Sequence, residues 1–146
     1  MTDVDEPIRL GGELRLSLPP ARTYYFQGSV YVVDVVGRLT VEVLRETLDA
    51  VYRDPVTLRP HAVIFREGPG ADYERSVLTF YQSDVPRPMP VLVGVVTRRA
   101  GVRMIAVATA LGFRARTGAR LSVYEDLIGA LVDARTAVAQ APPKRR

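Results

Sequence analysis

The sequence predicts a single α/β domain, with a four- or five-stranded mixed, partly parallel sheet and three to four packed helices. The first observation is a β-α unit at residues 29–54, where a valine-rich run broken only by Asp34 is followed by Gly37 and by apolar residues at helical spacing. The second is that short apolar runs alternate with helical patterns further along the chain. These runs occupy residues 61–66, 91–97 and 120–124. Such alternation implies parallel strands joined by right-handed crossovers.

The chain divides into three predicted segments. Residues 1–22 are expected to form an N-terminal arm or an edge strand, because residues 1–7 are polar, and therefore frayed, and residues 8–18 carry imperfectly alternating leucines. Residues 23–139 are expected to form the α/β domain. Residues 140–146 are predicted to be a disordered basic tail.

The first elements of the domain follow from turn and capping residues. Residues 23–36 are predicted to form a β-hairpin around the two-residue turn Gly28-Ser29. Thr40 is the expected N-cap of the helix that follows, and this helix ends at Asp54-Pro55.

Three further helices are expected. Asp72 is predicted to cap the next one, which runs to Tyr81, and the prolines of residues 85–90 exclude a helix or a central strand there. The apolar positions of residues 98–111 predict a packed helix that ends at Gly112. Asp126 is the expected cap of a closing helix that runs to Val138.

Composition excludes several kinds of chemistry. A chain of 146 residues fits one domain, and with no cysteine and only one histidine it can hold neither a disulfide nor a cysteine or histidine-rich metal site. We therefore expect no metal and no cofactor. The apolar runs are shorter than a membrane helix needs and the N-terminus is acidic, so we expect a cytoplasmic protein without membrane insertion.

Charge is distributed unevenly along the chain. Residues 1–84 hold 9 arginines against 13 acids, whereas residues 85–146 hold 11 basic residues against 3 acids. The first part is therefore net negative by 4 and the second net positive by 8. Opposite charges on the two parts are compatible with self-association as a homodimer.

Four stretches of the sequence resemble the STAS superfamily, the anti-sigma-factor-antagonist fold, and especially its small bacterial SpoIIAA-like branch. They are GRLTVEVLRETLDAVYRDP, PVLVGVV, RRAGVRMIAVATALG and RLSVYEDLIGAL, and the likeness covers residues 24–139. The resemblance implies a mixed sheet with packed helices, and a regulatory or interaction module rather than an enzyme. The phosphorylated serine of that family has no counterpart in the loop at residues 67–72, so its phospho-switch is not carried over.

The candidate binding surface follows from topology. If the strands ending at Val36, Arg66 and Thr97 are parallel, the loops after them emerge at one edge of the sheet, where open α/β sheets usually bind ligands. The residues predicted for this edge are Arg38, Glu67, Gly68, Gly70, Asp72, Arg98, Arg99 and Arg103. Arginine suits bidentate contacts with carboxylates and phosphates, although a solvated basic surface is the simpler interpretation.

Other chemistry-bearing residues have plain structural interpretations. Gly68 and Gly70 can cradle an anion, but no nucleotide-binding motif accompanies them, so a turn is favoured. His61 has no nucleophile to activate and is expected to be structural or exposed. Asp34 must be paired or face outward, and we favour a partly exposed sheet surface.

The sequence therefore favours a non-enzymatic regulatory domain that binds a protein partner through this edge, with self-association open. The alternative is a binding module for a small anionic or lipidic ligand, which a deep pocket would favour. No acid-base pair or nucleophile constellation can be assembled, and one aromatic residue, Phe113, beside the arginines does not predict a specific nucleic-acid reader.

Overall fold

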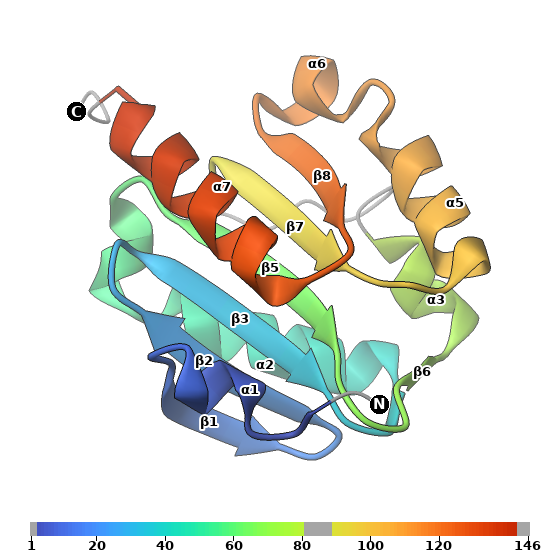
Figure 1. Cartoon of the computed structure of the whole chain (residues 1–146). Coiled ribbons are helices and arrows are strands. Elements are labelled where there is room, and N and C mark those ends of the chain that lie inside the picture. Colours follow the sequence, from blue (N-terminus) through green and yellow to red (C-terminus); the bar gives the residue numbers. More distant parts are fainter. Residues whose placement is uncertain (1–2, 81–88, 143–146) are drawn as a thin grey trace.

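The computed structural model describes residues 3–80 and 89–142 as an α/β fold around one mixed sheet (Figure 1). The six strands lie in the order β1-β2-β3-β5-β7-β8. They are β1 (Glu13–Leu18), β2 (Ala21–Phe26), β3 (Val30–Val35), β5 (Ala62–Glu67), β7 (Leu92–Val96) and β8 (Arg120–Tyr124). The first three are antiparallel neighbours, and β3, β5, β7 and β8 are mutually parallel.

The predicted hairpin is confirmed as β2 and β3, but Phe26 pairs with Val30, so its loop has three residues, 27–29, rather than the two predicted. Gly28 and Ser29 both have positive φ, at 93° and 61°, which is the backbone that a tight hairpin turn requires. The strand β1 adds an edge to this hairpin, and its pairing with β2 shifts register between Leu14 and Leu16. The leucine-bearing part of the predicted arm is therefore an edge strand of the sheet.

Three helices of eleven or more residues connect or close the parallel strands. They are α2 (Val41–Tyr52), α5 (Ala100–Ala110) and α7 (Leu127–Gln140). Two predicted caps are confirmed, because Thr40 accepts a hydrogen bond from the amide of Val43 and Asp126 accepts one from the amide of Gly129. Gly112, two residues after α5, has the left-handed conformation expected of a helix-ending glycine.

The helices cover opposite faces of the sheet (Figure 1). On one face, buried apolar side chains of α2 and α5, such as Leu44, Leu48 and Ala106, join the odd-numbered positions of β3 in one core cluster. On the other face, Leu127 and Leu131 of α7 join Val30, Val32, Ile64 and Leu92 in a second cluster. Burial on both faces explains why the parallel strands are continuous apolar runs rather than alternating ones.

The predicted element count is too low. Among the described residues the main sheet has six strands, not four or five, and there are six α-helices, not three to four. The sixth strand is β1, from the predicted N-terminal arm or edge strand, and the elements that were not predicted are α1 (Glu6–Arg9), β4 (Arg38–Leu39), η1 (Pro55–Leu58), β6 (Asp72–Tyr73) and α6 (Phe113–Thr117), whereas α3 (Arg75–Leu78) lies within the predicted helix of residues 72–81. Segments of two to five residues contain too little hydrophobic periodicity to be recognised in a sequence.

The predicted helix capped by Asp72 is wrong in its start. Asp72 instead pairs with Arg38 in the two-stranded parallel sheet of β4 and β6, and Glu74 precedes the short helix α3. Most of the proline run at residues 85–90, and the last four residues of the predicted basic tail, lie outside the described residues. No helix within residues 3–80 and 89–142 combines the length and apolarity that crossing a membrane would take.

Candidate functional site

The carboxyl ends of β3, β5, β7 and β8 meet at one edge of the sheet, as predicted, and a cleft of about 430 Å³ opens there. We call it the carboxyl-edge cleft. It is lined by Asp3, Glu6, Arg66, Glu67, Gly68, Gly70, Ala71, Val96, Thr97, Arg98, Arg99, Glu125, Asp126 and Leu127. Its volume lies within the range of about 300 to 1,000 Å³ that is usual for binding sites of proteins.

Five of the eight predicted binding residues line the cleft, namely Glu67, Gly68, Gly70, Arg98 and Arg99. The other three lie elsewhere. Arg38 and Asp72 form an exposed ion pair with each other at 2.7 Å, between β4 and β6, and Arg103 is exposed on α5.

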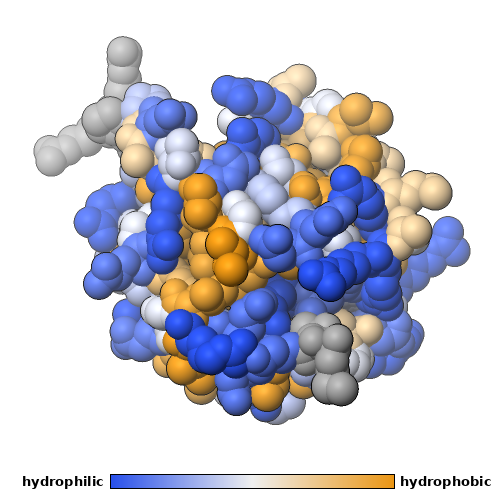
Figure 2. Space-filling view, viewed as in Figure 1, coloured by the Kyte–Doolittle hydropathy of each residue, from blue (hydrophilic) through white to orange (hydrophobic). Residues whose placement is uncertain are grey.

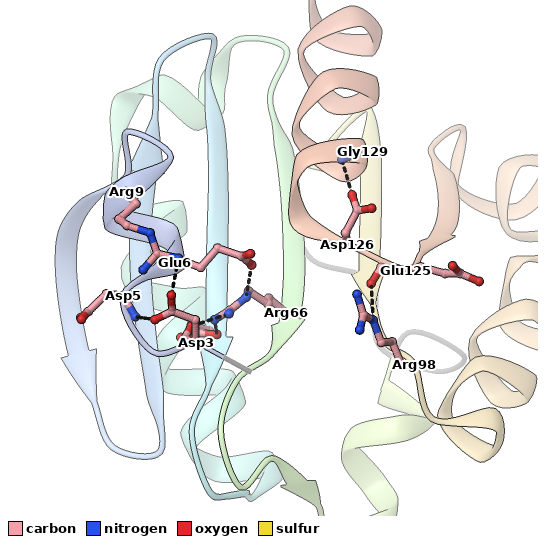
Figure 3. Close-up of polar contacts among 10 residues, drawn as sticks. Asp3, Asp5, Glu6, Arg9, Arg66, Arg98, Glu125, Asp126 and Gly129 are labelled. Carbon is pink, nitrogen blue, oxygen red and sulfur yellow. Dashed lines mark hydrogen bonds and ion pairs between the residues drawn. The ribbon is translucent and has the colours of Figure 1, made fainter. Parts of the chain in front are cut away.

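The N-terminal segment forms one wall of the cleft, which the sequence did not predict (Figure 3). Asp3 and Glu6 lie against Arg66 of β5, which is only 2% exposed. The Arg66 guanidinium donates to the Glu6 carboxylate at 3.1 Å and to the Asp3 carbonyl at 2.6 Å. The expectation that residues 1–7 are frayed is therefore wrong for Asp3 and Glu6, because their contacts with Arg66 hold them in place.

Asp34 lies beneath this wall, not on an exposed sheet surface. It is fully buried, and its Oδ1 accepts a hydrogen bond from Arg66 Nη1 at 2.7 Å. Burial raises the pKa of Asp34, and the attraction of the Arg66 guanidinium opposes that rise. The favoured outward orientation is wrong because Asp34 and Arg66 are register partners on adjacent parallel strands.

Glu67, the last residue of β5, directs its carboxylate toward Thr97 and Arg99, just before α5. Its carboxylate accepts hydrogen bonds from the Thr97 hydroxyl and from Arg99, whose Nε lies 2.8 Å away. The Glu67 carboxylate raises the pKa of Arg99, and burial together with Glu67 raises the pKa of Tyr73, whose ring lies under the Arg99 guanidinium. The Glu67 carboxylate therefore already occupies the position where the N-terminus of α5 and the Arg99 guanidinium would attract an anion.

The opposite wall comes from the loop between β8 and α7. Arg98 donates from Nε to the backbone carbonyl of Glu125 at 3.3 Å, and the Asp126 carboxylate caps α7 at 2.7 Å from the Gly129 amide (Figure 3). The lining as a whole contains five acids and three arginines, which leaves two more negative than positive charges.

The glycine loop agrees with the interpretation as a turn. The Gly68 amide donates to the Val35 carbonyl at 2.8 Å, so this amide is engaged within the sheet. A side chain at residue 68 would meet that carbonyl and Asp34 Oδ1, both at 2.8 Å. Gly70 has a φ of 71°, which a tight turn requires. The loop thus packs against β3, and the Gly68 amide is taken up by that contact rather than offered to a ligand.

His61, the only histidine of the chain, has a structural role. His61 is buried, its Nδ1 lies 2.9 Å from the Arg59 carbonyl, and its ring packs edge-on against Tyr52. Across the ranges 3–80 and 89–142, no group of three or more histidine, cysteine, aspartate or glutamate residues could hold a metal ion.

Two signals for the missed residues were present in the sequence. Asp34 and Arg66 are opposite charges near the ends of two buried strands, and Glu125 and Asp126 directly follow the last strand. Nothing in the sequence places Asp3 and Glu6 beside Arg66, because about sixty residues separate them.

No family model, curated protein or solved structure matches this chain.

Proposed function

We propose that this chain is a non-enzymatic protein-interaction domain whose carboxyl-edge cleft receives a cationic segment, with arginine or lysine side chains, from a protein partner. The observation that carries the proposal is the excess of acids in a cleft of about 430 Å³. The resemblance of the sequence to STAS modules, which are chiefly interaction modules, supports a binding role over a catalytic one.

The preference for a cation rests on which charges are already paired. Arg66 and Arg99 are held by carboxylates of the same chain, at 3.1 Å or less. Glu125 and Asp126 are exposed at the mouth of the cleft, where an added positive charge gains attraction without losing an existing ion pair. Electrostatic complementarity of this kind favours the association rate and the choice of partner.

A small anionic or lipidic ligand remains the alternative that the cleft volume favours. An anion would have to enter a cleft with excess negative charge, where Glu67 already holds Arg99 and Arg98 is left to bind it. For a lipid tail, the apolar cavity beneath α5 measures about 80 Å³, well below the usual size of ligand sites. The charge of the cleft and the small size of the apolar cavity both favour the cationic segment over a small anion or a lipid.

The test is selection of short random peptides displayed on phage against the purified full chain, followed by calorimetric titration of the enriched peptides. We expect enrichment of arginine and lysine. Glu125→Lys should weaken binding about tenfold or more, because it replaces an attraction at the mouth of the cleft by a repulsion.

The matched control is Glu46→Lys, which makes the same charge change on the exposed face of α2, outside the cleft lining. This variant should bind the selected peptides as the wild type does. Enrichment of acidic peptides, equal losses in both variants, or saturable binding of inorganic phosphate at millimolar concentration would each contradict the proposal, the last in favour of an anionic ligand.

A further inference from the structure

The helix α5 carries apolar residues on its solvent-facing side as well as on its inner side, and Arg103 is its one charged residue. Its inner positions, such as Ala106 and Thr109, are buried against the sheet. On its outer side Met104 is 72% exposed and Val107 is 45% exposed, and Leu111, just after the helix, is 78% exposed. Exposed apolar residues gathered on one side of a helix often mark an interaction surface. We call this outer side the α5 stripe, and in Figure 2 apolar side chains gather along the right of the molecule over α5.

The spacing of the α5 stripe is that of a helix-packing seam. Ala100, Met104, Val107 and Leu111 follow one another at intervals of four, three and four residues, which is the a/d spacing of helices that pack side by side. Gly101, which has no side chain, and Ala108 flank the seam and allow a second helix to approach closely. The pattern thus favours an α-helical occupant.

The surroundings of the α5 stripe are basic. Arg103 borders the seam, Arg114 and Arg116 follow on α6, and residues 85–124 contain no acid at all. In the part of the chain that the structure describes, neither Arg103 nor Arg114 has an acidic partner within ion-pair distance. A helix that complements this surface therefore carries glutamate or aspartate beside its apolar seam.

Two other occupants fit less well. Pairing of α5 with its own copy would bring Arg103 and its basic neighbours toward a second basic surface. A lipid surface is usually bound through aromatic or leucine-rich faces, whereas the α5 stripe has no aromatic residue and is largely alanine and glycine outside Met104, Val107 and Leu111.

We propose that the α5 stripe is a docking surface for an amphipathic helix of another protein, with an apolar heptad seam flanked by acidic residues. The α5 stripe shares no residue with the lining of the carboxyl-edge cleft, so this inference does not depend on the function proposed for the cleft.

The experiment uses the full chain and two synthetic amphipathic peptides of about three heptads, both with leucine at the seam. One carries glutamate and the other lysine at the flanking positions, and binding is measured by fluorescence anisotropy. We expect the glutamate peptide to bind at micromolar concentration and the lysine peptide at least about tenfold more weakly. The double change Met104→Ser with Leu111→Ser should weaken binding of the glutamate peptide about tenfold or more. Arg103→Glu should make the chain bind the lysine peptide more tightly than the glutamate peptide.

The matched control is Ile128→Ser with Val132→Ser, which removes two apolar side chains of similar exposure, 57% and 60%, from α7. It should leave peptide binding unchanged, and thermal unfolding checks that every variant folds. Equal binding of the two peptides, no binding of the glutamate peptide, or equal losses in the α5 and α7 variants would overturn the proposal. So would dimerisation, or sedimentation with vesicles of anionic lipid, that the Met104 and Leu111 changes abolish, because a second copy or a membrane would then cover the α5 stripe.

Discussion

At the scale of single residues, Gly68 illustrates how close packing, not ligand binding, can require a glycine. A Cβ there would lie 2.8 Å from the Val35 carbonyl oxygen, which belongs to the backbone of β3 and cannot turn aside. At Gly101, on the exposed side of α5, the same added carbon would meet no atom within 4 Å beyond its chain neighbours and the backbone of its own helix. The two positions therefore respond in opposite directions to the same substitution.

We expect Gly68→Ala to lower the free energy of unfolding by about 1 to 3 kcal/mol, because β3 and the loop must move apart. Gly101→Ala should raise it by a few tenths to about 1 kcal/mol, since alanine is the better helix former. Urea unfolding of both variants measures these changes. An unchanged free energy of unfolding for Gly68→Ala would contradict the prediction, because it would mean that the loop can move away from β3 at little cost.

Asp34 and Arg66 explain one failure of sequence reasoning. The valine run indicated that Asp34 is either paired or turned outward, but choosing between these needs the register of two strands about thirty residues apart. Register depends on how the whole sheet packs, so the sequence left the pairing open.

A double-mutant cycle tests this pair. Arg66→Leu should destabilise the fold by about 3 to 5 kcal/mol, because it leaves a buried carboxylate without its cation. Asp34→Val with Arg66→Leu should cost less than Arg66→Leu alone, since no charge then remains buried. Additive losses in urea unfolding would mean that the two side chains do not interact.

At the scale of elements, β8 and α7 are joined by Asp133. Its carboxylate accepts hydrogen bonds from the Tyr124 hydroxyl at 2.5 Å and from Arg120 at 2.6 Å. These bonds, the one from Tyr124 foremost, hold the pKa of Asp133 below its ordinary value, and burial with Asp133 raises the pKa of Tyr124 to about 12. The side chains of Arg120 and Asp133 are 43% and 39% exposed, so solvent screens this contact.

The sign of the pH effect follows from the lowered pKa. A carboxyl group with a depressed pKa in the folded state stabilises the fold above its ordinary pKa and loses that contribution as the pH falls through its folded value. Asp133→Asn should thus lower the unfolding free energy by about 1 kcal/mol or less at about pH 7 and by almost nothing near pH 2. Urea unfolding at both pH values decides this, with Asp49→Asn on the exposed face of α2 as the control.

The elements that could be predicted are those with strong local signals. Thr40 and Asp126 are capping residues before long apolar periods, and Gly28-Ser29 is a turn between two β-favouring runs. The pairing of Arg38 with Asp72 across two-residue strands has no such signal, because it depends on the loops that the sheet brings together. Local chemistry thus predicted the long elements and not the short ones.

At the scale of the whole molecule, the sequence predicted which strand ends meet at the carboxyl edge of the sheet but misjudged the charge of that edge. The parallel strands place Glu67, Arg98 and Arg99 at one edge, as the topological argument predicts. The wall formed by Asp3 and Glu6 changes that edge from a basic surface to a cleft with excess acid. Contacts between the N-terminus and β5 are tertiary, and no periodicity announces them.

The most direct test of the function proposed for the cleft is the affinity of one selected cationic peptide for three forms of the chain, measured by calorimetry at low and at high salt. We predict that Arg98→Gln binds more tightly than the wild type and Glu125→Gln more weakly, because the two changes alter the net charge of the same cleft in opposite directions. The differences should shrink as salt is added. Equal affinities for all three forms, or the reverse order, would contradict a cleft that recognises positive charge.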